Sequence, residues 1–166
     1  IGYPVVPGHE ASGVVVQAGE AVRRPLAPGT RVALDLLNRC GECEFCRTGR
    51  GNLCKYMYRG KLNLLGGFGQ YVSVPSEQVF EIGDSVSFEE AALAEPTACV
   101  IHSLSKANAR FAETMLVYGV GPMGMLHVTL GRAMGLGVGV VDPDPARRET
   151  ALSLGARFAV APGPDE

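Results

Sequence analysis

The chain has 166 residues, of which 46% are apolar and 19% are charged, and its formal charge is −2. This composition is sufficient for a packed core and provides no basic face of the kind that binds nucleic acid. No apolar run approaches the roughly 20 residues of a membrane-spanning helix, and no targeting segment is visible.

The first half of the chain has the pattern of an all-β domain. Residues 1–7 are rich in Pro and Gly and predict a loop. The β-branched run at 14–16 predicts a strand within residues 11–18, and residues 31–36 predict a second strand. Alternating residues at 70–74, closed by Pro75, and at 78–82 predict two further strands. We therefore expect a β domain over residues 1–84, interrupted by a cysteine-rich lobe at 38–56.

That lobe holds four of the five cysteines within fifteen residues: Cys40, Cys43, Cys46 and Cys54. The first three cysteines are separated by two residues each, and the fourth follows after seven more. The two-residue spacing lets the backbone fold around one ion, and four thiolates complete a tetrahedral shell with no open position. The alternatives are two disulfides, which suit short secreted chains, and four buried free thiols, which chance would rarely cluster in this way. The pattern favours a structural zinc site, and zinc-binding thiols imply a reducing compartment, hence the cytoplasm.

Residues 85–112 predict a helical connection. Ser87 and Glu90 have the spacing of a capping box, which predicts a short helix continuing to residue 94. Apolar residues with helical periodicity predict another helix over 97–106, directly after Glu95-Pro96.

Residues 113–166 predict the first part of a Rossmann-type parallel sheet. Buried-type strands are expected at 114–118, 137–141 and from 158 onward, and helices are expected from the turn at 119–124 to about 133 and over 146–154. A Gly-x-Gly-x-x-Gly turn follows the first strand and opens the first helix, which is the context that dinucleotide binding requires. The alternative is an ordinary βαβ unit whose glycines serve packing.

In the dinucleotide interpretation, Asp142 at the end of the second strand accepts the adenosine ribose hydroxyls, which favours NAD over NADP. Arg147 covers the adenine or reaches a phosphate, although a solvated helix charge explains it equally well. The candidate cofactor-binding residues are Gly119, Gly121, Pro122, Met123, Gly124, Asp142 and Arg147.

Five motifs occur in the order found in zinc-dependent medium-chain dehydrogenases of the alcohol dehydrogenase superfamily. They are Gly8-His9-Glu10-Ala-Ser-Gly13, the cysteine lobe, Gly66-Gly67-Phe68, Glu95-Pro96 and the turn at 119–124. The chain most resembles the polyol branch, which includes sorbitol and threonine dehydrogenases. This resemblance implies a GroES-like β domain packed on a Rossmann domain, a homodimer or homotetramer, and a catalytic zinc site. His9 and Glu10 belong to that site, with Glu95 as a direct or water-mediated ligand.

The chain departs from the family pattern at its N-terminal side. The family's catalytic zinc also uses a cysteine upstream of the Gly-His-Glu motif, followed by a serine or threonine of the proton relay, and neither is present. We therefore expect an internal piece of a longer protein in which both domains are incomplete. Cys99 is expected to fill a small buried apolar position, and His102 and His127 are assigned no role.

The functional hypothesis is a dehydrogenase that uses zinc and NAD and acts on a secondary alcohol: a polyol, a cyclitol or an amino alcohol. One alternative is a zinc-free quinone or enoyl-type reductase of the same superfamily, whose members typically lack both the cysteine lobe and the His-Glu pair. The other is a non-catalytic, zinc-stabilised binding module.

Overall fold

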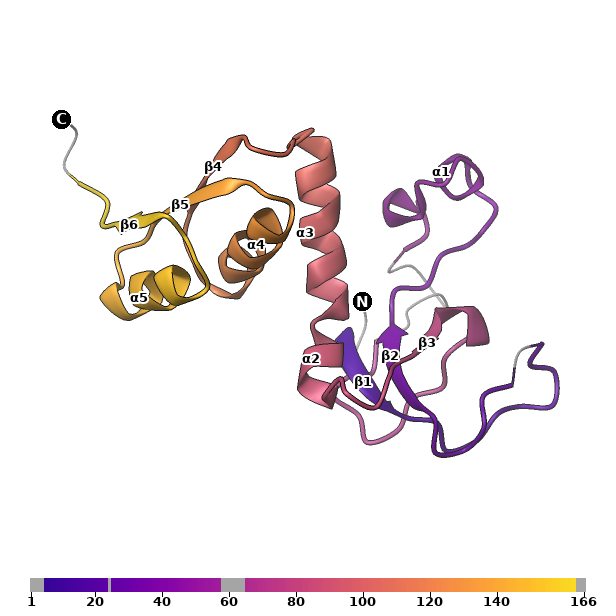
Figure 1. The fold of residues 1–166 in the computed structure, drawn as a ribbon. Coiled ribbons are helices and arrows are strands. Elements are labelled where there is room, and N and C mark those ends of the chain that lie inside the picture. Colours follow the sequence, from indigo (N-terminus) through magenta and orange to yellow (C-terminus); the bar gives the residue numbers. More distant parts are fainter. Residues whose placement is uncertain (1–4, 24, 58–64, 164–166) are drawn as a thin grey trace. The chain divides into compact units, whose positions relative to one another are not determined.

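A computed structural model describes residues 5–23, 25–57 and 65–163, which form two compact units (Figure 1). The first unit is Ile1–Glu95 and the second is Pro96–Glu166. Their division falls inside the segment 85–112 that the sequence predicts as a helical connection. No helix in the described ranges is long and apolar enough to cross a membrane.

The first unit contains a three-stranded antiparallel sheet in the order β1-β2-β3. Its strands are β1 (Glu10–Val14), β2 (Arg31–Asp35) and β3 (Val79–Glu81). Glu10 pairs with Asp35 at one end of the β1–β2 ladder, and Val14 pairs with Arg31 at the other. Val32, Ala33 and Leu36 are buried, so the central strand and the residue after it form the core of this unit.

Two strand predictions for this unit need correction. The first strand lies at Glu10–Val14, whereas the sequence predicts it within residues 11–18, because the pairing with β2 and not the β-branched run at 14–16 sets its start. Residues 70–74 form no strand, and Tyr71 and Val72 are exposed. Alternation alone does not make a strand, because a strand also needs a partner for its N–H and C=O groups. The strand predicted at 78–82 is present as β3.

Short helices complete this unit: α1 (Glu44–Arg47), η1 (Gly51–Leu53), η3 (Ser76–Gln78) and α2 (Phe88–Ala92). The capping box of α2 is confirmed, because the Glu90 amide donates to Ser87 Oγ and the Ser87 amide donates to Glu90 Oε2. Ser12 Oγ donates to the carbonyl of Phe88 over 2.7 Å, which ties α2 to β1.

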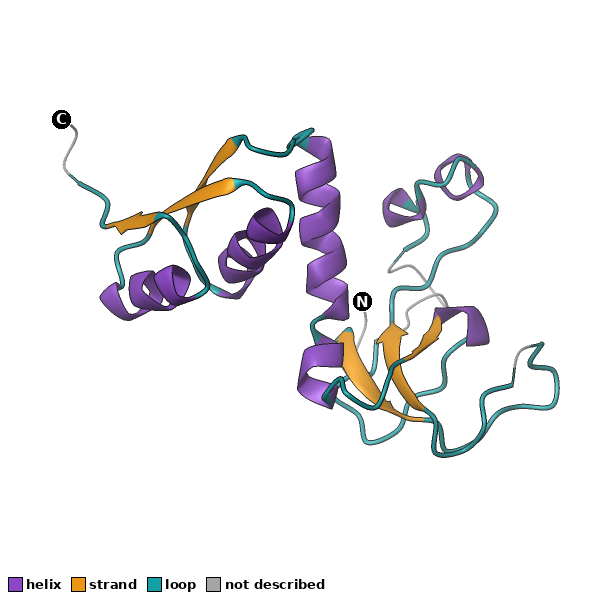
Figure 2. Ribbon diagram, viewed as in Figure 1, coloured by secondary structure: helices purple, strands orange, loops and turns teal. Residues whose placement is uncertain are grey.

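The second unit is a parallel sheet in the order β4-β5-β6, with a helix after each of the first two strands (Figure 2). Its strands are β4 (Thr114–Tyr118), β5 (Gly137–Val141) and β6 (Phe158–Val160). Its helices are α4 (Pro122–Ala133) and α5 (Pro145–Ser153), and α3 (Ala94–Lys106) precedes the sheet. Val120, Val128, Val138 and Val140 are fully buried and form the centre of the core. This arrangement confirms the predicted Rossmann-type segment.

Candidate functional site

The four cysteines of the lobe come together as the sequence predicts. One sulfur from each lies within 4.8 Å of the others, and all four thiols are free of disulfides. The Cys43 amide donates to Cys40 Sγ over 3.3 Å, and the Cys40 amide donates to Cys54 Sγ over 3.4 Å. Such N–H groups stabilise thiolates, so the lobe forms a four-cysteine structural zinc site.

The thiol pKa values in this cluster diverge. Backbone N–H groups, that of Cys46 first, lower the pKa of Cys43 to about 6. Burial raises the pKa of Cys46 to about 12, and hydrogen bonds with the neighbouring thiols add to the increase. Several anionic sulfurs crowded at one point cannot all ionise unless a cation neutralises them. The cluster therefore matches the charge of a divalent metal.

A second group of possible metal ligands lies in the first unit. His9, Glu10 and Glu95 each place one ligand atom within 4.8 Å of the others. His9 Nε2 lies 3.9 Å from Glu95 Oε2, with the histidine side chain 41% exposed and the glutamate side chain 18% exposed. Glu10 begins β1, and Glu95 lies in the first turn of α3. One nitrogen and two oxygen donors suit zinc, and three protein ligands leave a coordination position open.

The fifth cysteine lies on α3, one helical turn beyond Glu95. The sequence predicted a buried apolar role for Cys99, and that prediction is wrong because Cys99 is exposed. Val100 and Leu104 on the same helix face the core of the second unit. With period 3.6, the position before Val100 points away from that core.

The predicted dinucleotide turn has the geometry that its glycines suggest. Gly119 has φ +84, a conformation that favours glycine. A Cβ on Gly124 would lie 2.1 Å from the carbonyl oxygen of Gly119, so the helix packs closely against the turn. A Cβ on Gly121 would meet nothing within 4 Å, so the backbone there is open to an approaching group.

The N-terminus of α4 has no side-chain cap, with Gly121 at the N-cap and Pro122 following. By contrast, Ser87 caps α2 and Asp144 caps α5. The uncapped end leaves backbone N–H groups, including that of Met123, without a partner inside the helix. Such N–H groups and the helix dipole attract a phosphate.

The candidate ribose acceptor Asp142 is only 2% exposed. Its Oδ2 accepts from the Val120 amide over 2.7 Å, and its Oδ1 accepts from the Asp144 amide over 2.9 Å. The N–H groups of Val120 and then Asp144 hold the pKa of this carboxyl below its usual range. Asp142 thus joins the glycine turn to the loop that leads into α5, a link that sequence reasoning missed.

The two arginines of α5 differ in their contacts. Arg147 Nε lies 3.6 Å from Asp144 Oδ2, and its side chain is 55% exposed. Arg148 Nη1 donates to the carbonyls of Asp142 and Pro143 over 2.7 and 2.9 Å. Arg148 therefore holds the loop after β5, a role that sequence analysis did not assign. An arginine one turn into the helix that follows such a loop is the signal that could have suggested it.

His127, to which sequence analysis assigned no role, contacts residues of two helices. Its Nδ1 lies 2.8 Å from the carbonyl oxygen of Met123, and its Nε2 lies 3.2 Å from Ser103 Oγ. Because a carbonyl only accepts, Nδ1 carries the proton and Nε2 accepts from the serine when the ring is neutral. His127 thus connects α4 to α3.

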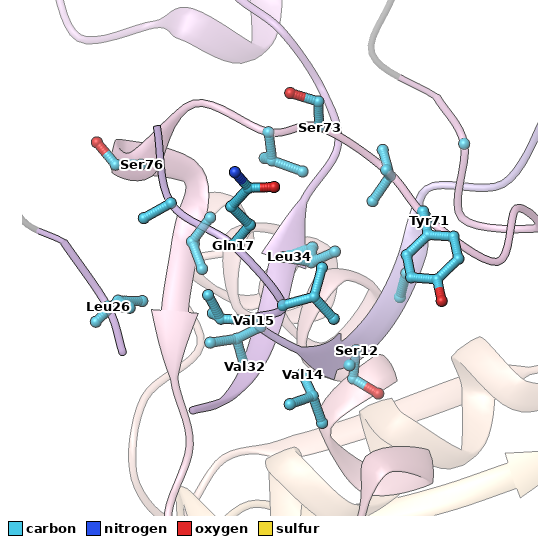
Figure 3. Close-up of a pocket in the computed structure, with 18 of the residues that line it drawn as sticks. Ser12, Val14, Val15, Gln17, Leu26, Val32, Leu34, Tyr71, Ser73 and Ser76 are labelled. Carbon is cyan, nitrogen blue, oxygen red and sulfur yellow. The ribbon is translucent and has the colours of Figure 1, made fainter. Parts of the chain in front are cut away.

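A groove of about 570 Å³ lies on the β1 side of the first sheet (Figure 3). Val14, Val15, Val32 and Leu34 line it together with Tyr71. None of the predicted metal ligands is among its lining residues. Its lining residues include no His, Cys, Asp or Glu, so the candidate metal site is the group formed by His9, Glu10 and Glu95 and not this groove.

Comparisons with known proteins identify the family of the chain. Residues 1–84 match the family of alcohol dehydrogenase GroES-like domains. The chain is 37% identical to a sorbitol dehydrogenase from Bacillus subtilis over 95% of its own length and 45% of that protein. It is 36% identical to an L-threonine 3-dehydrogenase from Rhizobium johnstonii, over 96% of the chain and 46% of that protein.

Among solved structures, a zinc-binding dehydrogenase from Sinorhizobium meliloti bound to NADP superimposes with a TM-score of 0.89 at 37% identity. The match covers 96% of the present chain and 47% of that one. The chain thus spans about half the length of the proteins it matches. With its GroES-like half, four-cysteine cluster and parallel sheet, it belongs to the zinc-containing medium-chain alcohol dehydrogenase superfamily.

Proposed function

We propose that the chain is the part of a zinc- and NAD-dependent dehydrogenase that carries three ligands of its catalytic metal and its phosphate-binding turn. The observation that carries this proposal is the convergence of His9, Glu10 and Glu95 within 4.8 Å, apart from the four-cysteine group. A four-thiolate shell is closed, whereas three nitrogen and oxygen donors leave room for a substrate oxygen. Two groups with these different donor sets favour one structural and one catalytic zinc.

When bound, zinc would supply Lewis acidity that lowers the pKa of an alcohol hydroxyl, and NAD would supply the hydride acceptor. His9 would bind through an imidazole nitrogen, and Glu10 and Glu95 would bind through carboxylate oxygens. The two carboxylates match the double positive charge of the ion. The free N–H groups at the start of α4 would bind the pyrophosphate, while Gly124 and Asp142 hold the turn in place.

For the substrate, we propose a secondary alcohol with further oxygen or nitrogen groups, which includes polyols, cyclitols and amino alcohols. An oxygen-rich ligand set is harder than one with cysteine, and it favours oxygen donors from the substrate. The names of two relatives, a sorbitol and a threonine dehydrogenase, point to the same class. A zinc-free reductase is disfavoured because it has no use for two separate groups of metal ligands.

For the cofactor, we propose NAD, although the relative from Sinorhizobium meliloti was solved with NADP. The loop after β5 carries two carboxylates, the buried one of Asp142 and the partly exposed one of Asp144. A 2′-phosphate placed there would add about two negative charges beside them. Arg147 is paired with Asp144, and Arg148 donates to backbone carbonyls of the loop. Both cations are therefore already engaged within the protein, which disfavours their binding a 2′-phosphate.

Metal analysis and a dehydrogenase assay on the intact protein test this function. We expect two zinc ions per chain, and NADH formation from secondary alcohols that is lost when a chelator removes one of them. Glu95→Gln should lose that zinc and the activity, whereas Glu89→Gln, an exposed residue on α2, should keep both. One zinc per chain together with full activity would contradict the catalytic site. Two zinc ions without NADH formation from any secondary alcohol would instead support a non-catalytic module.

A further inference from the structure

The motif Gly66-Gly67-Phe68 has no part in the function proposed above, yet it contacts the residues just before the metal ligands. The Gly67 amide donates to the carbonyl of Gly8 over 3.0 Å, and the Phe68 amide donates to that of Pro7 over 3.1 Å. The Gly69 amide closes the turn on the carbonyl of Gly66 over 2.8 Å. Residues 66–69, called here the 66–69 turn, are therefore hydrogen-bonded to Pro7 and Gly8, the two residues directly before His9.

The approach of the two segments is close enough to require glycine. A Cβ on Gly67 would lie 3.0 Å from the carbonyl carbon of Gly8 and 3.3 Å from the His9 amide nitrogen. Gly8 has φ +91, and a Cβ there would lie 2.6 Å from the Phe68 ring. The ring thus covers the Cα of Gly8, although it is 79% exposed overall.

His9 and Glu10 are consequently held from two directions. On one side, Glu10 pairs with Asp35 in the β1–β2 ladder. On the other side, the 66–69 turn fixes Pro7 and Gly8. Metal affinity depends on how exactly the surrounding groups orient the ligands, and loss of such support typically lowers it 10–100-fold.

We propose that the 66–69 turn is a backbone clasp that positions the His9–Glu10 pair for metal binding, with Phe68 as a positioning residue. This inference rests on the proposed function, since it assumes that the pair binds zinc. The clasp acts through the backbone of residues 7–9, and Phe68 itself donates no metal ligand.

The test is Gly67→Ala in the intact protein, with Gly13→Ala as its matched control. The added methyl at position 67 presses on backbone atoms that must move by a few tenths of an ångström, whereas at position 13 it meets nothing within 4 Å. Zinc per chain is measured after equilibration with a graded series of chelator concentrations. The four-cysteine zinc serves as an internal reference, and circular dichroism checks the fold.

We expect Gly67→Ala to release the second zinc at a chelator concentration about tenfold lower than the wild type. The four-cysteine zinc should stay in place, and Gly13→Ala should match the wild type. If Gly67→Ala does not fold, Phe68→Ala is the second variant, because it removes atoms and adds none. Phe68→Ala should show the same selective loss of the second zinc. Its control is Phe80→Ala, which removes another exposed ring, on β3, and should match the wild type.

Two outcomes overturn the clasp and differ in what else they overturn. Wild-type chelator resistance in both Gly67→Ala and Phe68→Ala would refute the clasp and leave the catalytic zinc site standing. A wild-type protein that holds only the four-cysteine zinc would refute the proposed function, and the clasp with it.

Discussion

Two glycines of the same turn should differ in how alanine affects the stability of the protein, because one is closely packed and the other is open. In Gly124→Ala the new methyl would lie 2.1 Å from the Gly119 oxygen, whereas real Cβ contacts essentially never fall below 3.0 Å. The helix or the turn must therefore shift by about 1 Å. Overpacking of this kind costs about 1–3 kcal/mol of unfolding free energy. The shift also displaces the phosphate-binding N–H groups.

Gly121→Ala should leave the fold unchanged. Its methyl meets no atom within 4 Å, and φ is −65, which alanine adopts readily. The entropy lost from the unfolded chain stabilises the protein by about 0.4–1 kcal/mol, and the poorer N-cap offsets a similar amount. The same methyl occupies the open space at the backbone where the pyrophosphate approaches, so NAD affinity should fall at least tenfold, or about 1.4 kcal/mol.

Thermal melts without cofactor and calorimetric titration with NAD separate the two effects. Gly124→Ala should lower both the melting temperature and NAD affinity. Gly121→Ala should lower NAD affinity alone. Wild-type NAD affinity in Gly121→Ala would refute the reasoning, because the glycines would then serve only the packing of a βαβ unit.

Three further predictions concern the lobe, the cap of α2 and the cofactor. Cys43→Ser should lose the structural zinc and lower the melting temperature; unchanged zinc content would contradict the four-cysteine assignment. Hydrogen bonds from the amide and hydroxyl of Ser87 lower the pKa of Glu90, so its contribution to stability is present above the unfolded-state pKa and lost as the pH falls through the folded-state value. The stability difference between wild type and Glu90→Gln, measured by denaturant unfolding, should therefore exist at pH 7 and vanish in acid; a difference independent of pH would exclude a charge effect. If the proposed function holds, the intact protein should prefer NAD to NADP by about tenfold or more in kcat/KM, and equal values for the two cofactors would argue against the role given to the carboxylates after β5.

The second unit could be predicted from sequence almost to the residue. The strands at 114–118 and 137–141 are apolar runs bounded by glycines or an aspartate, and the helix between them starts at Pro122. Local signals of this kind determine the element boundaries in this parallel sheet. Only β5 is buried on both faces; the buried-type strand predicted at 114–118 exposes alternate residues, among them Leu116 and Tyr118. The capping box at Ser87 was predictable for the same reason, because its partners are three residues apart.

The first unit was harder to predict because its strands depend on distant partners. The start of β1 is fixed by pairing with Asp35, and no local pattern in residues 10–14 encodes that partner. Similarly, the contact between Asp142 and the Val120 amide joins residues on different elements. The sequence shows the acidic residue at that strand end, but only the structure shows that backbone N–H groups donate to both of its oxygens.

The cysteine lobe has a consequence for sequence tolerance. Its two short helices, α1 and η1, contain no buried residue, so the lobe has no apolar core of its own apart from Cys54. Gln78 instead holds the chain at the entrance of the lobe, where its Nε2 donates to the carbonyls of Asp35 and Leu37 over 2.9 Å in each case. Substitutions between the cysteines therefore remove little buried apolar surface. Most of the exposed residues between the cysteines can therefore be replaced while the four sulfurs stay in place, except Gly41 and Gly49, whose positive φ favours glycine.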